Sequence, residues 1–92
     1  MVLNIPKPPL AGSNFSVQLD GYTGAGKLAV YVAGQRLLEK DCPDPPCHEM
    51  VFLTRDLAGR ELKVIGTAMG QSISKTFRIN IKESEGGAMM AG

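Results

Sequence analysis

The sequence predicts a small all-β domain, and three observations carry this prediction. Residues 14–20 alternate apolar and polar side chains, and residues 77–82 do the same near the other end of the chain. Because successive side chains of a strand point to opposite faces, each segment has one face for a core and one for solvent. Shorter segments of the same kind lie between them, separated by turns at the spacing of about 8–12 residues that is typical of sandwiches and barrels. No segment keeps a helical period long enough to predict a packed helix.

Residues 1–12 are predicted to form a Pro-rich arm or an edge strand. Apolar residues at positions 2, 3 and 5 favour an extended strand, and prolines follow at positions 6, 8 and 9. Because proline has no N–H to donate to a ladder, these residues confine the segment to the edge of a sheet or leave it as an arm.

Residues 13–82 are predicted to form the sandwich domain. Glycines mark the loop at 21–26, a tight hairpin at Gly34 and a turn at 68–70, while residues 41–46 hold three prolines and are expected to be irregular. Residues 55–60 are expected to form a turn or one helical turn, closed by Gly59. The expected strands are 14–20, 27–33, 36–39, 49–54, 62–67 and 72–82.

The core is expected to collect the apolar members of each alternation. All three phenylalanines, at positions 15, 52 and 77, fall at expected core positions. The residues predicted to point inward are Phe15, Val17, Leu19, Leu28, Val30, Val32, Val51, Leu53, Leu62, Val64, Phe77, Ile79 and Ile81.

Residues 83–92 are predicted to form a tail rich in glycine and methionine. Met89 and Met90 follow a pair of glycines. Two interpretations stay open: the pair belongs to a disordered terminus, or it is a flexible hook that docks into a neighbouring subunit, because methionine adapts to irregular pockets.

The composition excludes several classes of protein. Hydrophobic residues make up 43% and charged residues 21% of the 92 residues, which is ordinary for a folded domain. The net charge of +1 provides no field to attract nucleic acid or anionic lipid, so we predict no nucleic-acid binding. No apolar run approaches the roughly 20 residues needed to span a bilayer, so we predict no membrane insertion. The first ten residues lack the pattern of a signal peptide, so either the chain functions without secretion or a leader lies outside this sequence.

Cys42 and Cys47 allow three interpretations: a disulfide, a pair of metal or redox thiolates, or free thiols. Their C-x4-C spacing lacks a second pair to complete a zinc site. His48 is a candidate third ligand, and a fourth would come from an acidic residue at position 41, 44 or 49. The disulfide is the favoured interpretation, and it points to an oxidising compartment, a virion exterior or a thermophile.

No other motif predicts chemistry. Residues 21–27 read GYTGAGK and satisfy most of the phosphate-loop pattern, but Leu28 stands where a hydroxyl should bind Mg²⁺, and a strand follows instead of a helix. The single histidine lies in a proline-rich loop, without a nucleophile to make it a catalytic base. Asn14 begins an N-x-S triplet, a pattern that arises often by chance. We therefore expect no catalytic residue, no bound metal or cofactor, and no enzyme activity.

The stretches SNFSVQLDGYTGAGKLAVYV (13–32) and DLAGRELKVIGTAMGQSISKTFRINI (56–81) resemble the immunoglobulin-like sandwich modules of bacterial surface proteins and phage structural proteins. In such modules a D-x-x-G turn, here residues 56–59, leads into a core strand. The resemblance implies an antiparallel sandwich of about six or seven strands. The chain departs from antibody domains because it has no tryptophan and its cysteines are too close for an inter-sheet pair.

By analogy with these modules, three functions are considered. The first is a non-enzymatic structural subunit that docks on the protein subunits of a larger assembly, such as a virion shell or surface filament. The expected location is extracellular, at the cell surface or on a virion. The second is a module of a multidomain adhesin or secreted enzyme that spaces domains or binds protein or carbohydrate. The third is a small metal or redox protein that uses Cys42, Cys47 and His48. The expected partner contacts are Ile5, Pro8, Pro9, Tyr22, Tyr31, Met89 and Met90.

Overall fold

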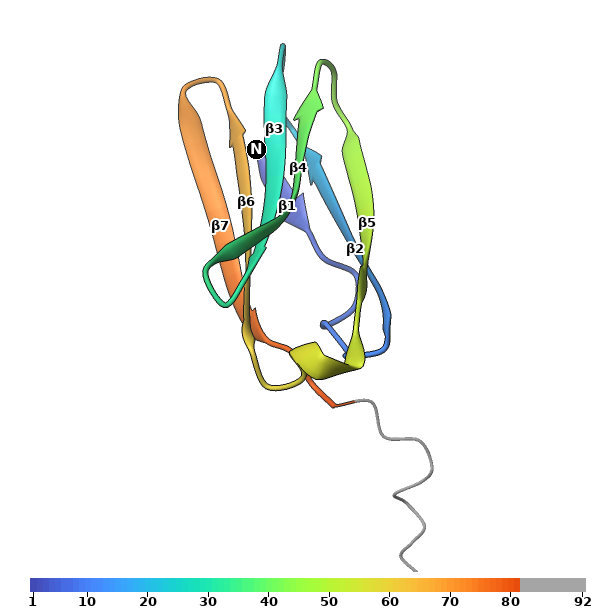
Figure 1. The fold of residues 1–92 in the computed structure, drawn as a ribbon. Coiled ribbons are helices and arrows are strands. Elements are labelled where there is room, and N and C mark those ends of the chain that lie inside the picture. Colours follow the sequence, from blue (N-terminus) through green and yellow to red (C-terminus); the bar gives the residue numbers. More distant parts are fainter. Residues whose placement is uncertain (82–92) are drawn as a thin grey trace, which may run out of the picture.

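Two antiparallel sheets pack face to face and enclose one core (Figure 1). The computed structural model describes residues 1–81. The three-stranded sheet has the order β1-β2-β5 and consists of β1 (Val2–Asn4), β2 (Ser13–Asp20) and β5 (Cys47–Leu53). The four-stranded sheet has the order β4-β3-β6-β7 and consists of β3 (Gly26–Val32), β4 (Gln35–Cys42), β6 (Glu61–Ala68) and β7 (Gln71–Arg78). The all-β prediction is confirmed.

The predicted turns and strands are present, but some strands end at residues other than those predicted. The expected helical turn is the 3-10 turn η1 (Arg55–Leu57). β4 is longer than predicted, because residues 40–42 continue to pair with residues 26–28 of β3. β7 ends at Arg78 and not at Lys82, because the chain then leaves β6 and pairs with Leu10 instead.

Two hairpins of the four-stranded sheet turn over two residues with positive φ. Ala33 and Gly34 join β3 to β4 with φ of 53° and 81°, and Met69 and Gly70 join β6 to β7 with φ of 55° and 70°. Positive φ at both positions is the geometry of the type I′ hairpin, whose twist matches that of the strands. Both turns lie where the glycines predict them.

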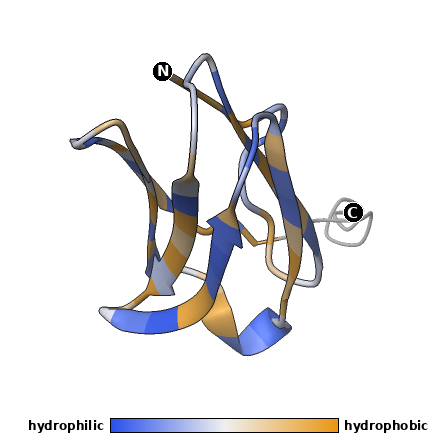
Figure 2. Cartoon of the chain, turned by 90° about the horizontal axis from the view of Figure 1, so that it is seen from above, coloured by the Kyte–Doolittle hydropathy of each residue, from blue (hydrophilic) through white to orange (hydrophobic). Residues whose placement is uncertain are grey.

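The core follows the predicted alternation. Figure 2 shows hydrophobic and hydrophilic residues alternating along the strands. Most residues predicted to point inward are buried, while Val51 and Phe77 are half-buried and pack against the core. Two expectations are wrong: Ile81 is 69% exposed because the strand has already ended, and Phe52 is 55% exposed because Leu53 beside it takes the inward position.

The N-terminal segment crosses from one sheet to the other. Residues 2–4 pair with β2, whereas residues 9–11 flank Asn80 in a short parallel bridge. The Asn80 N–H donates to the Pro9 carbonyl at 3.0 Å, and the Ala11 N–H donates to the Asn80 carbonyl at 2.8 Å. Prolines are tolerated in this crossing segment because its backbone N–H groups are not needed for a strand ladder.

The two sheets approach each other closely where Gly66 of β6 faces Leu19 of β2. A Cβ added at Gly66 would lie 2.5 Å from the Leu19 Cδ1 atom. Leu19 is fully buried, so the space that glycine leaves is filled by the leucine side chain.

We therefore expect Gly66→Ala to lower the free energy of unfolding by about 1–3 kcal/mol, the usual cost of overpacking a core. Urea unfolding measures the change. Thr67→Ala, at the adjacent and exposed position, is the control and should cost less than about 1 kcal/mol. Equal effects of the two variants would contradict the close packing of Gly66 on Leu19.

Candidate interaction surface

The outer faces of the two sheets differ in charge. On the four-stranded sheet, Lys27 lies 3.6 Å from Glu39 and 3.8 Å from Asp41, and Arg36 lies 3.0 Å from Glu39. The outer face of the three-stranded sheet has a single carboxylate, that of Asp20 at the end of β2, and otherwise neutral polar and apolar side chains. Its residues are Val2, Asn4, Asn14, Ser16, Gln18, Asp20, His48, Met50 and Phe52.

Large apolar side chains are exposed on this outer face. Met50 is 50% exposed and Phe52 is 55% exposed, and both point outward from β5 because they are two residues apart on the same strand. Their cross-strand neighbours on β2 are Ser16 and Asn14, which are small and uncharged. The result is an apolar patch bordered by neutral polar groups, the composition found at the centre of protein interfaces.

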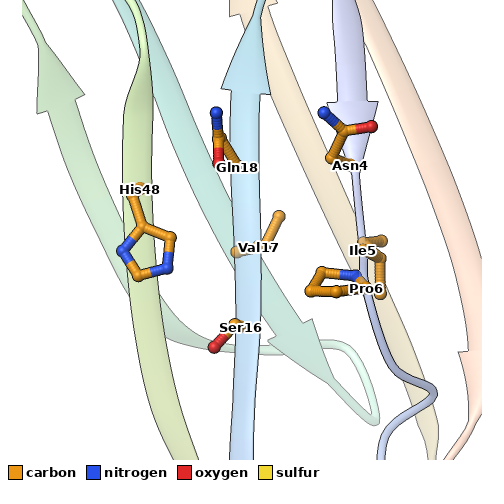
Figure 3. Close-up of a pocket in the computed structure, with 7 residues that line it drawn as sticks. All are labelled: Asn4, Ile5, Pro6, Ser16, Val17, Gln18 and His48. Carbon is orange, nitrogen blue, oxygen red and sulfur yellow. The ribbon is translucent and has the colours of Figure 1, made fainter.

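A groove runs along β2 on the same face. Its upper part has a volume of about 400 Å³ and is lined by Asn4, Ile5, Pro6, Ser16, Val17, Gln18 and His48 (Figure 3). Its lower part, of about 190 Å³, is lined by Pro6, Lys7, Asn14 and Ser16. The two parts share Pro6 and Ser16, so they adjoin, and we call them together the β2 groove.

The β2 groove exists because β1 is short. β1 pairs with residues 18–20 of β2 and ends at Asn4, and Pro6 then follows without an N–H to continue the ladder. In Figure 3 the chain bends away from β2 below Pro6. No sequence motif marks this groove, because it results from the order of the strands.

The residues predicted as partner contacts do not come together. Ile5 lines the β2 groove, Pro8 is exposed, and Tyr31 is half-buried on the opposite sheet. Pro9 and Tyr22 are buried in the sandwich, which removes them from the surface. Met89 and Met90 lie outside the described residues.

Tyr22 anchors the loop between β2 and β3 to the core. Its O–H donates to the Asp44 carbonyl at 3.3 Å, and its ring lies so close to Gly26 that an added Cβ there would be 2.9 Å from Cε2. Burial raises the pKa of Tyr22, and the carboxylates of Asp20 and Asp44 raise it further.

The disulfide between Cys42 and Cys47 is present, as predicted, and closes the loop from β4 to β5. Both cysteines are buried, whereas His48 points outward, since neighbouring residues of a strand face opposite sides. The three side chains therefore do not converge on one metal ion. Residues 1–81 contain no cluster of three or more His, Cys, Asp or Glu side chains that would hold a metal.

The segment that resembles a phosphate loop is an ordinary connection. Residues 21–27 lead from β2 into β3, and the Lys27 side chain is engaged by Glu39 and Asp41 on the outer face of the four-stranded sheet. The lysine is thus aimed at carboxylates of its own sheet.

The comparisons with known proteins give no identification. No protein-family model, no curated protein and no solved structure matches the chain significantly. Over the described part of the chain, no helix is long and apolar enough to span a bilayer.

Reduction of the disulfide should lower the free energy of unfolding by about 2 kcal/mol, the chain-entropy value for a loop of this length. Urea unfolding with and without a reducing agent measures it. The control is the double variant Cys42→Ala/Cys47→Ala, whose stability should not respond to the reductant. A wild-type stability that is equally insensitive would contradict a stabilising disulfide.

Glu49 joins the edges of the two sheets and should make stability depend on pH. A hydrogen bond from the Met50 N–H at 3.1 Å, and then the Lys40 ammonium at 3.1 Å, hold the pKa of Glu49 below its ordinary 4.5. Because the pKa of Glu49 is lower in the folded state, its carboxylate stabilises the fold at pH values above the ordinary pKa. This contribution is lost as the pH falls through the folded-state pKa.

We expect Glu49→Gln to cost less than about 1 kcal/mol at neutral pH, as for other partly exposed pairs. The difference from the wild type should shrink below pH 4.5. Urea unfolding at several pH values checks this, with Glu61→Gln as a control at an exposed position. A difference that stays constant with pH would refute the role of the Glu49 carboxylate.

Proposed function

We propose that the chain is a non-enzymatic interaction module of the immunoglobulin-like type that docks on protein subunits of a larger assembly, such as a virion shell or a surface filament. The observation that carries the proposal is the outer face of the three-stranded sheet. Met50 and Phe52 are exposed there among neutral side chains, whereas the opposite sheet is charged.

The strand order supports the immunoglobulin-like assignment. The order β4-β3-β6-β7 is that of the C′-C-F-G sheet of such modules, and β1-β2-β5 corresponds to their A, B and E strands. After the β3-β4 hairpin the chain crosses to the three-stranded sheet, where it forms β5. It then returns to the four-stranded sheet, where β6 pairs with β3. The parallel bridge of Leu10 with Asn80 ties the first segment to the last.

The energetics favour docking through the face and not through the edge at β4. Full burial of an exposed phenylalanine or methionine contributes about 1.5–3 kcal/mol, and covering the half of Met50 and Phe52 that is exposed contributes part of this. Neutral neighbours lose less solvation energy than charged ones when a partner covers them. Charged residues line β4, the edge of its sheet, and charges on an edge strand oppose edge-to-edge pairing with another chain. The disulfide supports a location outside the cytoplasm, in an oxidising environment.

The alternative, a module of an adhesin or secreted enzyme that only spaces domains, requires no partner on this face. The two proposals therefore differ in what a probe on the outer face of the three-stranded sheet would contact.

A photo-crosslinking amino acid in place of Phe52, in the particles or cells that carry the protein, should capture one defined partner protein. The matched control places the same amino acid at Tyr31, on the opposite sheet, and should not capture it. With the purified partner, Met50→Ser/Phe52→Ser should weaken binding by roughly tenfold to a hundredfold, as for the central residues of an interface. Capture from Tyr31 alone, or from neither position, would refute docking through this face.

A further inference from the structure

The middle of β2 has an unpaired edge inside the three-stranded sheet. On one side, β5 pairs with residues 13–19 of β2. On the side that faces β1, only residues 18–20 are paired. Residues 14–17 therefore have no ladder partner on that side among residues 1–81. Every second residue of that stretch directs its N–H and C=O toward the open side. An extended segment added there would complete the ladder.

The β2 groove lies over this open edge and has different chemistry at its two ends. The upper part is lined by neutral side chains, with the apolar Ile5, Pro6 and Val17 among them. Lys7 lines the lower part. Arg55 lies near the foot of β2, where its side chain comes within 3.3 Å of a Cβ placed on Gly12. Neither Lys7 nor Arg55 forms an ion pair with a described residue.

We propose that the β2 groove is a peptide-binding site and that its occupant is residues 83–90 of the same chain, bound in an extended conformation along β2. This inference is independent of the proposed function. The last described residues lie at the foot of β2, because Asn80 pairs with Leu10, whose carbonyl accepts a 2.9 Å hydrogen bond from the Ser13 hydroxyl. A segment that continues from Ile81 therefore starts beside the lower end of the groove.

The order of side chains in this segment matches the groove in the same direction. Glu83 and Glu85 come first and would meet the basic end, and Met89 and Met90 come later and would meet the neutral, partly apolar end. Carboxylates beside Lys7 and Arg55 gain favourable charge interactions, and methionine fits irregular apolar surfaces. The exit point of the chain and the charge order thus give the same orientation independently.

The spacing also agrees. Glu85 and Met89 are four residues apart, which is about 13 Å in an extended chain. Asn14 and Gln18, which line the lower and upper parts of the groove, are separated by the same four residues. The two glycines between the acidic and apolar residues have no side chain, which suits the centre of the groove, where Pro6 lines both parts.

Amide hydrogen exchange of the full chain, read by NMR, tests the proposal. The amides of residues 14–17 that face the open side should be protected, and Met89→Ser/Met90→Ser should speed their exchange by at least about tenfold. Met69→Ser, an exposed methionine in the hairpin from β6 to β7, is the matched control and should leave these amides unchanged. Equal exchange in the wild type and the double variant would overturn the proposal.

A charge swap separates a specific contact from a general loss of structure. Lys7→Glu should speed exchange at the same amides, and Lys7→Glu/Glu85→Lys should restore their protection. Failure of the second substitution to restore it would refute the proposed orientation. Protection that appears only with rising concentration and a doubled mass would place the segment of a second copy in the groove and overturn the intramolecular form. Crosslinking from Phe52 is unaffected by these outcomes, so the two proposals fail separately.

Discussion

The missing N–H of Pro6 is the constraint on which the candidate surface depends. It ends the pairing of β1 with β2 after Asn4, and the chain then crosses to the other sheet, where residues 9–11 bond to Asn80. The crossing has two effects at once. It fastens the last segment of the sandwich to the first, and it leaves part of β2 without a neighbour. The crossing of the N-terminal segment therefore explains both the β2 groove and the attachment of Asn80 to residues 9–11.

The distribution of charge separates the two sheets into different roles. Ion pairs cross the outer face of the four-stranded sheet, and Lys40 and Glu49 link the edges of the two sheets at 3.1 Å. Individually such exposed pairs contribute little to stability, but they keep that side of the molecule well solvated. Among the described residues, the outer face of the three-stranded sheet has no ion pair and exposes methionine and phenylalanine instead, so contact with another protein costs less solvation energy there.

The sequence was sufficient to predict the elements of the fold but not the candidate surface. Strict alternation around Val17 and Val30 identifies core strands, and glycines locate both hairpins, because these signals are local. The run from Met50 to Leu53 is apolar throughout, so the alternation alone does not decide which of its residues points inward, and the prediction that Phe52 lies in the core is wrong. The position of Tyr22 in a loop predicts a place at the surface, yet the close approach of Gly26 makes room for its ring in the core. The groove depends on which strands are neighbours, and that is set by contacts between distant segments.

The parallel bridge between Leu10 and Asn80 has a mechanical consequence. The chain begins at one end of the sandwich, and the last described residues leave from the other (Figure 1). A force that pulls these two ends apart acts along the bridge, so the hydrogen bonds of Asn80 to Pro9 and Ala11 are loaded in shear and must break together. A domain tied in this way transmits tension along its long axis, through the β1–β2 pairing and this bridge, while its sheets stay packed.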